Sequence, residues 1–237
     1  MNTVNELNMH AFYEEMPQTQ NYDLFLQEKL RGIYENYQGF HTFSFPKESV
    51  ENYEEMKKYL LMEVLPLHRC TELPHKKILD FGLVFRLAGR KGNENLLINQ
   101  DLARMYGKSG EELYQDACLS SPLLKPVFMH PLPEVLKMPD MRKDVYVITN
   151  EEADHGAGVL FYPGMLEEAA CVMKGNYFVL PSSIHELLLV KEKLGRGLNL
   201  EMIVRDINLK DVPAEEQLSD RVYFYDAENE KLDFYSI

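Results

Sequence analysis

The side chains with the clearest chemical potential lie in one short string between positions 181 and 186. Ser182, Ser183, His185 and Glu186 supply two hydroxyls, an imidazole and a carboxylate. A nucleophilic serine needs an imidazole about 3 Å away as its base, and an acid that orients the far imidazole nitrogen. One turn cannot aim all three groups at each other, so such partners normally come from separate elements. The string alone is therefore weak evidence for catalysis.

The same string also has a structural interpretation, which we favour. Ser183 and Glu186 have the spacing of a capping box, in which side chains satisfy backbone N–H groups at a turn, and His185 would bond to the nearby chain. The alternative is a hydrolase that uses Ser182 or Ser183 with His185 and a carboxylate from elsewhere, such as the loop from Glu151 to Asp154. Between these lies a binding role, because polar groups at strand ends often line ligand clefts.

A second polar cluster, Asn150-Glu-Glu-Ala-Asp154-His155-Gly156, is expected between two strands. Its carboxylates and imidazole are ligand types for a divalent cation, with Asp154 and His155 as the candidate ligands. The spacing does not match a calcium-binding loop. Acidic loops in acidic proteins are commonly just solvated, so the sequence predicts no bound metal and no cofactor.

Composition narrows the choice of partner and compartment. The chain has 237 residues, with 25 Lys and Arg against 38 Asp and Glu, and a net charge of −13. It has no basic stripe, so nucleic acid and anionic membranes are not expected partners, which leaves a protein or a small molecule. It also lacks the roughly 18 consecutive apolar residues of a membrane span. Its three cysteines are far apart in sequence, which favours a reducing cytoplasm.

The elements that must position these groups begin with a mostly helical region. Apolar residues at helical spacing predict helices within residues 10–37 and again over residues 50–64, the second ending before Pro66. Two apolar runs, residues 78–87 and 95–99, predict a hairpin. Residues 100–119 then predict a helix with a capping box at Ser109 and Glu112, which Pro122 should prevent from continuing.

The C-terminal half has a denser pattern of strands. Residues 122–143 contain several prolines and predict an irregular connection. After it we expect strands at 144–150 and 157–162, a helix at 163–175, strands at 176–181 and 187–190, a helix at 198–210 and a closing hairpin. This gives an α+β fold, with N-terminal helices and a hairpin (1–121), a connection (122–143), and a mainly antiparallel C-terminal lobe (144–237) in the order strand, strand, helix, strand, strand. The two parts should share an interface.

The string VYVITNEEADHGAGVLFYPGMLEEAACVMKGNYFVLPSSIHELLLV resembles a bacterial domain-of-unknown-function family common in anaerobic gut bacteria. The resemblance continues upstream in LPHKKILDFGLVFRL and downstream in LSDRVYFYDAENEKL, and it spans residues 5–235. Members usually carry a further segment before the part similar to VNELNMHAFYEEM, so the chain is expected to be a shortened member. The resemblance implies a fold, but no activity, ligand or cofactor.

Taken together, the sequence predicts a non-enzymatic cytoplasmic module for binding or regulation, because no recognisable set of nucleophile, base and charge stabiliser is present. The hydrolase at Ser182–Glu186 stays as the alternative. A third hypothesis is self-association through the aromatic C-terminal hairpin, with Tyr225 and Phe234 in the contact. No reaction class is assigned.

Overall fold

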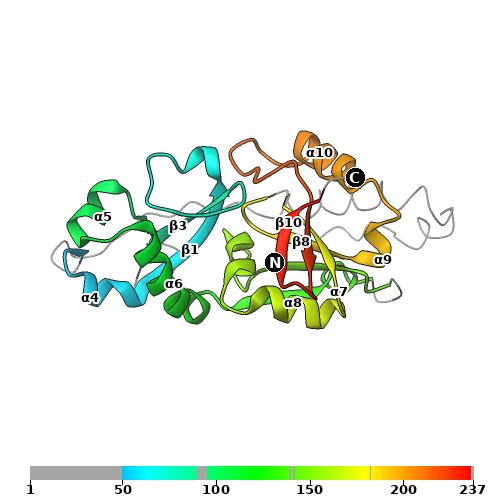
Figure 1. Cartoon of the computed structure of the whole chain (residues 1–237), viewed down its shortest axis with the longest axis horizontal. Coiled ribbons are helices and arrows are strands. Elements are labelled where there is room, and N and C mark those ends of the chain that lie inside the picture. Colours follow the sequence, from blue (N-terminus) through cyan, green and yellow to red (C-terminus); the bar gives the residue numbers. More distant parts are fainter. Residues whose placement is uncertain (1–49, 90–94, 139, 141, 182, 236–237) are drawn as a thin grey trace, which may run out of the picture.

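The structure, a computed structural model, describes residues 50–89, 95–138, 140, 142–181 and 183–235. The helices expected within residues 10–37 lie outside these ranges. The described elements form two antiparallel sheets that lie side by side along the long axis of the molecule, each flanked by helices (Figure 1). The α+β class predicted from the sequence is confirmed. Among the described helices, none has the length and apolar character that a bilayer crossing requires.

The first sheet has a long central strand, β3, that pairs with all three of its other strands. The predicted hairpin around residues 78–99 is confirmed by the pairing of β3 with β4. The elements of this part are α4 (Tyr53–Met56), η1 (Lys57–Tyr59), β1 (Leu60–Pro66), η2 (Leu67–Arg69), β2 (Lys76–Ile78), β3 (Phe81–Ala88), β4 (Asn95–Leu97), α5 (Gln100–Tyr106) and α6 (Gly110–Leu124).

The helix predicted over residues 50–64 is wrong. Within residues 51–64, Tyr53–Met56 is the α-helical part, and Leu60–Pro66 is the strand β1, which pairs with β3 along its whole length. Six of its seven residues are buried, so its sequence is a nearly continuous apolar run rather than an alternating one. Such a run has no period that separates a buried strand from a buried helix, and the partner strand decides between them.

Helix α6 confirms the predicted capping box and corrects the predicted helix end. Ser109 Oγ accepts the N–H of Glu112, and the Glu112 carboxylate accepts the N–H of Ser109. The helix continues through Pro122 to Leu124, because a proline in the last turn removes only one hydrogen bond from the helix. Ser120 and Ser121 both donate to the carbonyl of Leu60, which ties α6 to β1.

The second sheet has six antiparallel strands in the order β10-β9-β7-β8-β6-β5. Its elements are β5 (Val127–Pro131), α7 (Leu132–Val135), β6 (Val145–Asn150), η3 (Gly156–Phe161), α8 (Met165–Met173), β7 (Tyr177–Leu180), β8 (Leu187–Lys191), α9 (Glu192–Gly195), α10 (Leu200–Lys210), β9 (Tyr223–Asp226) and β10 (Lys231–Phe234). The turn and strand chosen for residues 183–190 are confirmed by β8, and the closing hairpin by β9 and β10.

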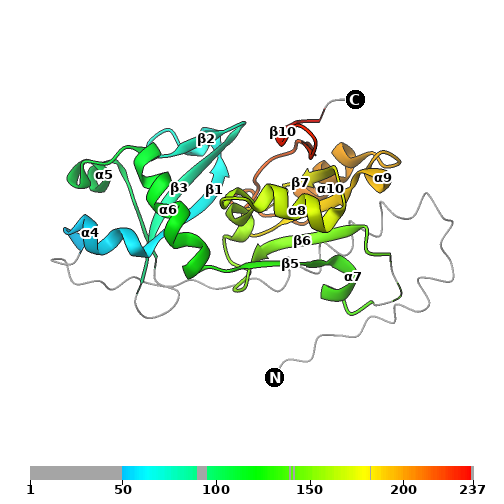
Figure 2. The same cartoon turned by 60° about the horizontal axis from the view of Figure 1, so that its bottom comes forward.

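Helices cover both faces of the second sheet, and Figure 2 shows α8 and α10 with the sheet strands. Tyr177 and Val179 share a core with α8, whereas Phe178 and Leu180 share a separate core with α10. Alternate residues of β7 therefore point to opposite, equally apolar layers. This explains why β7 and β8 are continuous apolar runs in the sequence.

Two sequence-based assignments in this half are corrected. Residues 157–162 are not a strand, because Gly156–Phe161 forms the 3-10 helix η3. The proline-rich segment is not irregular throughout, because it contains the edge strand β5 and the short helix α7. An edge strand tolerates Pro131 at its end, since one side needs no partner. The predicted order of strand, strand, helix, strand, strand is therefore wrong at its second strand, because β6 is followed by η3 and α8 before β7 and β8.

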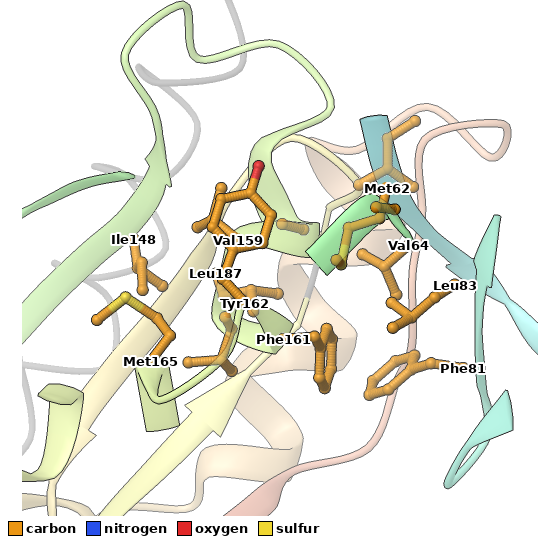
Figure 3. Packing of buried hydrophobic residues seen from close by; sticks show 14 of the residues in the cluster. Met62, Val64, Phe81, Leu83, Ile148, Val159, Phe161, Tyr162, Met165 and Leu187 are labelled. Atoms are coloured by element: carbon orange, nitrogen blue, oxygen red, sulfur yellow. The ribbon is translucent and has the colours of Figure 1, made fainter. Parts of the chain in front are cut away.

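The two sheets share one hydrophobic core. Figure 3 shows Phe161 of η3 facing Phe81 of β3, and their ring centroids are 5.9 Å apart. Met62, Val64 and Leu83 of the first sheet belong to the same buried cluster as Val159 and Leu187 of the second part. A polar contact adds to this packing, because the Tyr223 hydroxyl donates to Asp80 at 2.5 Å. The junction between the sheets is thus a packed interface.

Candidate functional site

The loop after β6 is shaped by Asn150, the last residue of that strand. Its side-chain oxygen accepts the N–H groups of Glu152 and Asp154 at 3.1 and 3.3 Å, and its amide nitrogen donates to the carbonyl of Asp154 at 2.7 Å. Asparagine commonly organises turns in this way. The loop therefore holds the backbone of Asp154 in a fixed place beside the end of the strand.

The backbone on both sides of Asp154 is left-handed. Ala153 has φ 52° and His155 has φ 50°, a region that residues other than glycine seldom adopt. Gly156, the next residue, is closely packed. A Cβ at this position would lie 2.6 Å from the Asn150 backbone nitrogen and 2.8 Å from the His185 carbonyl oxygen. Glycine at 156 therefore lets the loop pack directly onto the segment that contains His185.

In the segment before β8, Ser183 is part of a buried turn. Ser183 is fully buried, and its Oγ accepts the N–H of His185 at 2.9 Å, which closes a turn. The segment is fixed further by the N–H of Ile184, which donates to the carbonyl of Glu216, and by a bridge between Ser183 and Gln217. The predicted turn is present, but Ser183 Oγ accepts the N–H of His185 rather than the N–H of Glu186. Ser182 lies outside the described residues.

Strand pairing brings the two segments together. β6 and β8 are antiparallel neighbours with Ile148 opposite Leu187, so the end of β6 meets the start of β8. The Thr149 hydroxyl then donates to the His185 carbonyl at 2.7 Å. The two clusters that are separate in the sequence are therefore parts of one site.

At the centre of this site is the carboxylate of Asp154. Its Oδ1 lies 2.8 Å from His155 Nδ1 and 3.5 Å from His185 Nδ1. The backbone N–H of His155 donates to His185 Nδ1 at 3.2 Å, and His185 Nε2 lies 3.7 Å from Glu216 Oε1. Asp154, His155 and His185 each offer a ligand atom, and these atoms lie within 4.8 Å of one another. We call these three residues the Asp-His-His cluster.

The charges within the cluster shift its pKa values. Hydrogen bonds with His155 and then His185 hold the pKa of Asp154 far below its ordinary value, against an opposing effect of burial. Burial would lower the pKa of His155, but the hydrogen bond with Asp154 and the negative charge of Glu63 raise it above the ordinary value. Asp154 is therefore ionised at neutral pH, and its charge favours the protonated form of His155.

The influence of Glu63 shows that the cluster faces the first sheet. Glu63 is a buried residue of β1, and its carboxylate pairs with Arg86 of β3 at 2.5 Å. A small cleft opens between the sheets at this point, and Asp154 and His155 line it. Its wall also includes Met62, Glu63, Lys125, Asn150 and Tyr162. Burial, and then the charge of Glu63, raise the pKa of Tyr162, so its hydroxyl stays neutral in this wall.

The structure brings some of the candidate residues together in the cluster and places others outside it. Asp154, His155 and His185 meet, Ser183 closes the turn that contains His185, and Glu186 is buried directly before β8. The sequence reasoning missed Glu63 and Glu216 as neighbours of the site. A lone carboxylate within the apolar run LLMEVLP was an available signal for Glu63. No comparable signal marked Glu216, which comes from a loop distant in sequence.

The hypothesis of self-association through the C-terminal hairpin depends on whether Tyr225 and Phe234 are exposed. Tyr225 is fully buried and stacks on Tyr177 with 5.1 Å between ring centroids, so its ring belongs to the core under α8. Phe234 of β10 is 37% exposed and lies beside Tyr223. Only the second of the two named residues is accessible to a partner.

Fold and site together define an α+β protein with a polar, histidine-containing cleft between two antiparallel sheets. The chain belongs to a family of unknown function, DUF5688, whose model matches residues 1–227. The resemblance to a domain-of-unknown-function family is thereby confirmed. No curated protein matches the chain. No solved structure matches it either. The comparisons thus assign no activity, and they give no support to the hydrolase alternative.

Proposed function

We propose that this protein is a non-enzymatic binding or regulatory module whose ligand site is the cleft between the two sheets. The observation that carries the proposal is the convergence of polar side chains from both sheets on one small opening. Glu63 belongs to the first sheet, whereas Asn150 is the last residue of β6 in the second sheet, and Asp154 and His155 follow it. Sites with a few convergent polar groups in an otherwise apolar surrounding are typical of ligand binding.

The position of the cleft supports regulation as well as binding. The two sheets touch through an apolar interface that includes Met62 and Phe161, and the cleft lies beside it. A ligand held by groups from both sheets binds one relative position of the sheets more tightly than others. Binding of this kind shifts the population toward that position, which is how a binding module passes a signal to a partner.

The charge of the site favours a cation or a small polar molecule over an anion. Glu63 and Asp154 place two carboxylates at the cleft, and the chain as a whole carries −13. The cation Lys125 already pairs with Glu152, and Arg86 already pairs with Glu63. This supports a small-molecule, ionic or protein ligand and argues against nucleic acid, whose phosphates need unpaired basic side chains.

The setting in the cell is also part of the proposal. A bacterial origin among gut anaerobes is supported by the resemblance of residues 145–190 to members from such organisms. A cytoplasmic location is supported by three free cysteines, of which Cys171 is exposed. Exposed free thiols persist in a reducing compartment.

The described serine of the hydrolase alternative, Ser183, gives that alternative no support. A fully buried hydroxyl that already accepts a backbone N–H cannot reach a substrate. Catalysis would require this serine to leave the turn and expose its Oγ. The Asp-His-His cluster therefore carries the proposal as a binding site rather than as a catalytic one.

A thermal-shift screen tests the proposal. The native chain is screened against small metabolites and divalent metal ions, beside Lys125→Ala and Asp154→Asn, which each change one residue of the cleft wall. A ligand at a hundred times its Kd stabilises the fold by about 2.7 kcal/mol, which is readily seen as a higher Tm. Asp101→Asn is the control, because Asp101 is an exposed carboxylate of α5 paired with Arg104.

The expected result is a stabilising compound whose effect is lost in at least one cleft variant and kept in Asp101→Asn. A shift that persists unchanged in both cleft variants would place the binding site elsewhere. If no compound in either class shifts the Tm, the cleft is not a small-molecule or metal site, and the proposal fails in this form.

A further inference from the structure

The Asp-His-His cluster has the ligand types of a transition-metal site. We propose that Asp154, His155 and His185 bind one divalent metal ion of the zinc class. This inference rests on the proposed function, because it names the ligand of the same cleft. Histidine nitrogens and a carboxylate oxygen are preferred ligands of Zn²⁺, whereas Mg²⁺ and Ca²⁺ prefer oxygen ligands alone.

The distances fit a tetrahedral ion after small movements. Ligand atoms about 2.0–2.1 Å from Zn²⁺ are about 3.3 Å apart in a tetrahedron. Asp154 Oδ1 lies 2.8 Å from one histidine nitrogen and 3.5 Å from the other, which are values on either side of that spacing. All three ligand atoms lie within 4.8 Å of one another. Shifts of about 1.5 Å or less therefore convert the cluster into a coordination site.

The tautomer of His185 prepares it for binding. Its Nδ1 lies 3.2 Å from the backbone nitrogen of His155 and 3.5 Å from Asp154 Oδ1, so a ring without a proton on Nδ1 directs that lone pair at the cluster. The proton is then on Nε2, which faces Glu216 Oε1 at 3.7 Å. A carboxylate near the far nitrogen of a ligating histidine is a common feature of metal sites, because it orients the ring. The long amide contact at Nδ1 is one that a metal ion replaces easily.

The surroundings hold the ligands in place and leave one side open. Asn150 fixes the backbone of Asp154, and Thr149 fixes the backbone of His185. His185 is nearly buried, whereas Asp154 and His155 are half-buried and line the cleft. Three protein ligands leave a fourth position for water or a ligand in the cleft, as in metal sites that exchange their fourth ligand.

Metal titration of the metal-free, tag-free chain tests the inference. Isothermal titration calorimetry with Zn²⁺ is expected to show one ion per chain, and Mg²⁺ and Ca²⁺ are expected to bind at least about a hundred times more weakly. Co²⁺ serves as a second probe, because tetrahedral coordination by nitrogen and oxygen gives it a distinct visible absorption band. This band reports coordination geometry directly, independently of any activity.

Two variants locate the site. His155→Gln and Asp154→Asn change half-exposed side chains, so neither is expected to unfold the protein. Each should weaken Zn²⁺ binding by more than about a hundredfold and remove the Co²⁺ band, since a direct ligand matters more than the groups that merely orient one. His130→Gln is the matched control, because His130 is an exposed histidine of β5 paired with Glu134.

The outcomes separate the two proposals. Binding of Zn²⁺ that survives both His155→Gln and Asp154→Asn would overturn the metal site. A small molecule that stabilises the chain through Lys125, together with no Zn²⁺ binding, would also overturn the metal site but leave the cleft as a binding site. If the native chain neither binds Zn²⁺ nor is stabilised by any small molecule, both proposals are wrong.

Discussion

The loop from Asn150 to Gly156 and the turn from Ser183 to Glu186 contribute to one cluster but differ in exposure. The turn is buried, with Ser183 at 0% and Glu186 at 2%. The loop is accessible, and the Asp154 side chain is 49% exposed. Buried polar groups serve backbone hydrogen bonds, whereas half-exposed groups can exchange a partner for a ligand. The comparison shows that exposure, rather than residue type, separates the structural segment from the binding one.

This difference in exposure reverses the relative importance that the sequence indicated for the two segments. The Ser-Ser-x-His-Glu string contains more catalytic residue types than the acidic loop, yet Ser183 closes a turn. Among the described residues of the string, only His185 takes part in the cluster, through its ring nitrogen. The acidic loop, expected to be solvated, supplies the central carboxylate. Four changes test this division of roles.

The largest effect is expected from Gly156→Ala, which breaks the contact between the two segments. The added Cβ would meet Thr149, the Asn150 nitrogen and the His185 carbonyl oxygen, two of which are backbone atoms that cannot turn away. Overpacking of this kind should lower the free energy of unfolding by about 3 kcal/mol. Urea denaturation measures the loss.

Gly197→Ala is the control for this change, because its nearest neighbour would be an ordinary 3.5 Å from the new Cβ. Equal stability of the two variants would show that the segments do not pack as tightly as described.

Ser183→Ala is expected to have the next largest effect on stability. It removes the acceptor of the His185 N–H at a fully buried position, which should cost about 1–3 kcal/mol. Chemical denaturation followed by circular dichroism measures the change. A variant as stable as the native chain would contradict the structural role of this serine and reopen the hydrolase hypothesis.

Asp154→Asn is expected to separate binding from folding. Because the carboxylate is half exposed, its loss should change the stability of the metal-free chain by less than about 1 kcal/mol. The same variant should lose the rise in Tm that Zn²⁺ gives the native chain. Thermal melts with and without Zn²⁺ measure both effects, and a retained Zn²⁺ response would place the ion elsewhere.

The smallest effect is expected from Glu152→Gln, in the same loop but outside the cluster. Glu152 pairs with Lys125, and its side chain is 49% exposed. Pairs near the surface contribute about 0–1 kcal/mol, so the variant should remain close to native stability and keep the Zn²⁺ response. Thermal melts of this variant and of Asp154→Asn, with and without Zn²⁺, would show whether the whole acidic loop contributes to Zn²⁺ binding or only Asp154.

Local sequence signals predicted the elements well where neighbouring residues decide the outcome. The capping box at Ser109 and Glu112 lies within one helical turn and is present in the structure. The apolar runs of β7 and β8 were likewise identified as strands. Two of the failures share a cause, since Leu60–Pro66 and residues 157–162 are both short apolar runs without period. Their conformation depends on whether a partner strand is available.

The sequence by itself determined the α+β composition, the excess negative charge and the two polar strings that supply the site. Tertiary structure alone decided that the strings meet. Asp154 and His185 come together because β6 and β8 pair antiparallel with Ile148 opposite Leu187, and Glu63 approaches because the first sheet packs on η3. Each contact joins residues distant in the chain, and distant pairing is set by burial of whole strands rather than by the local pattern.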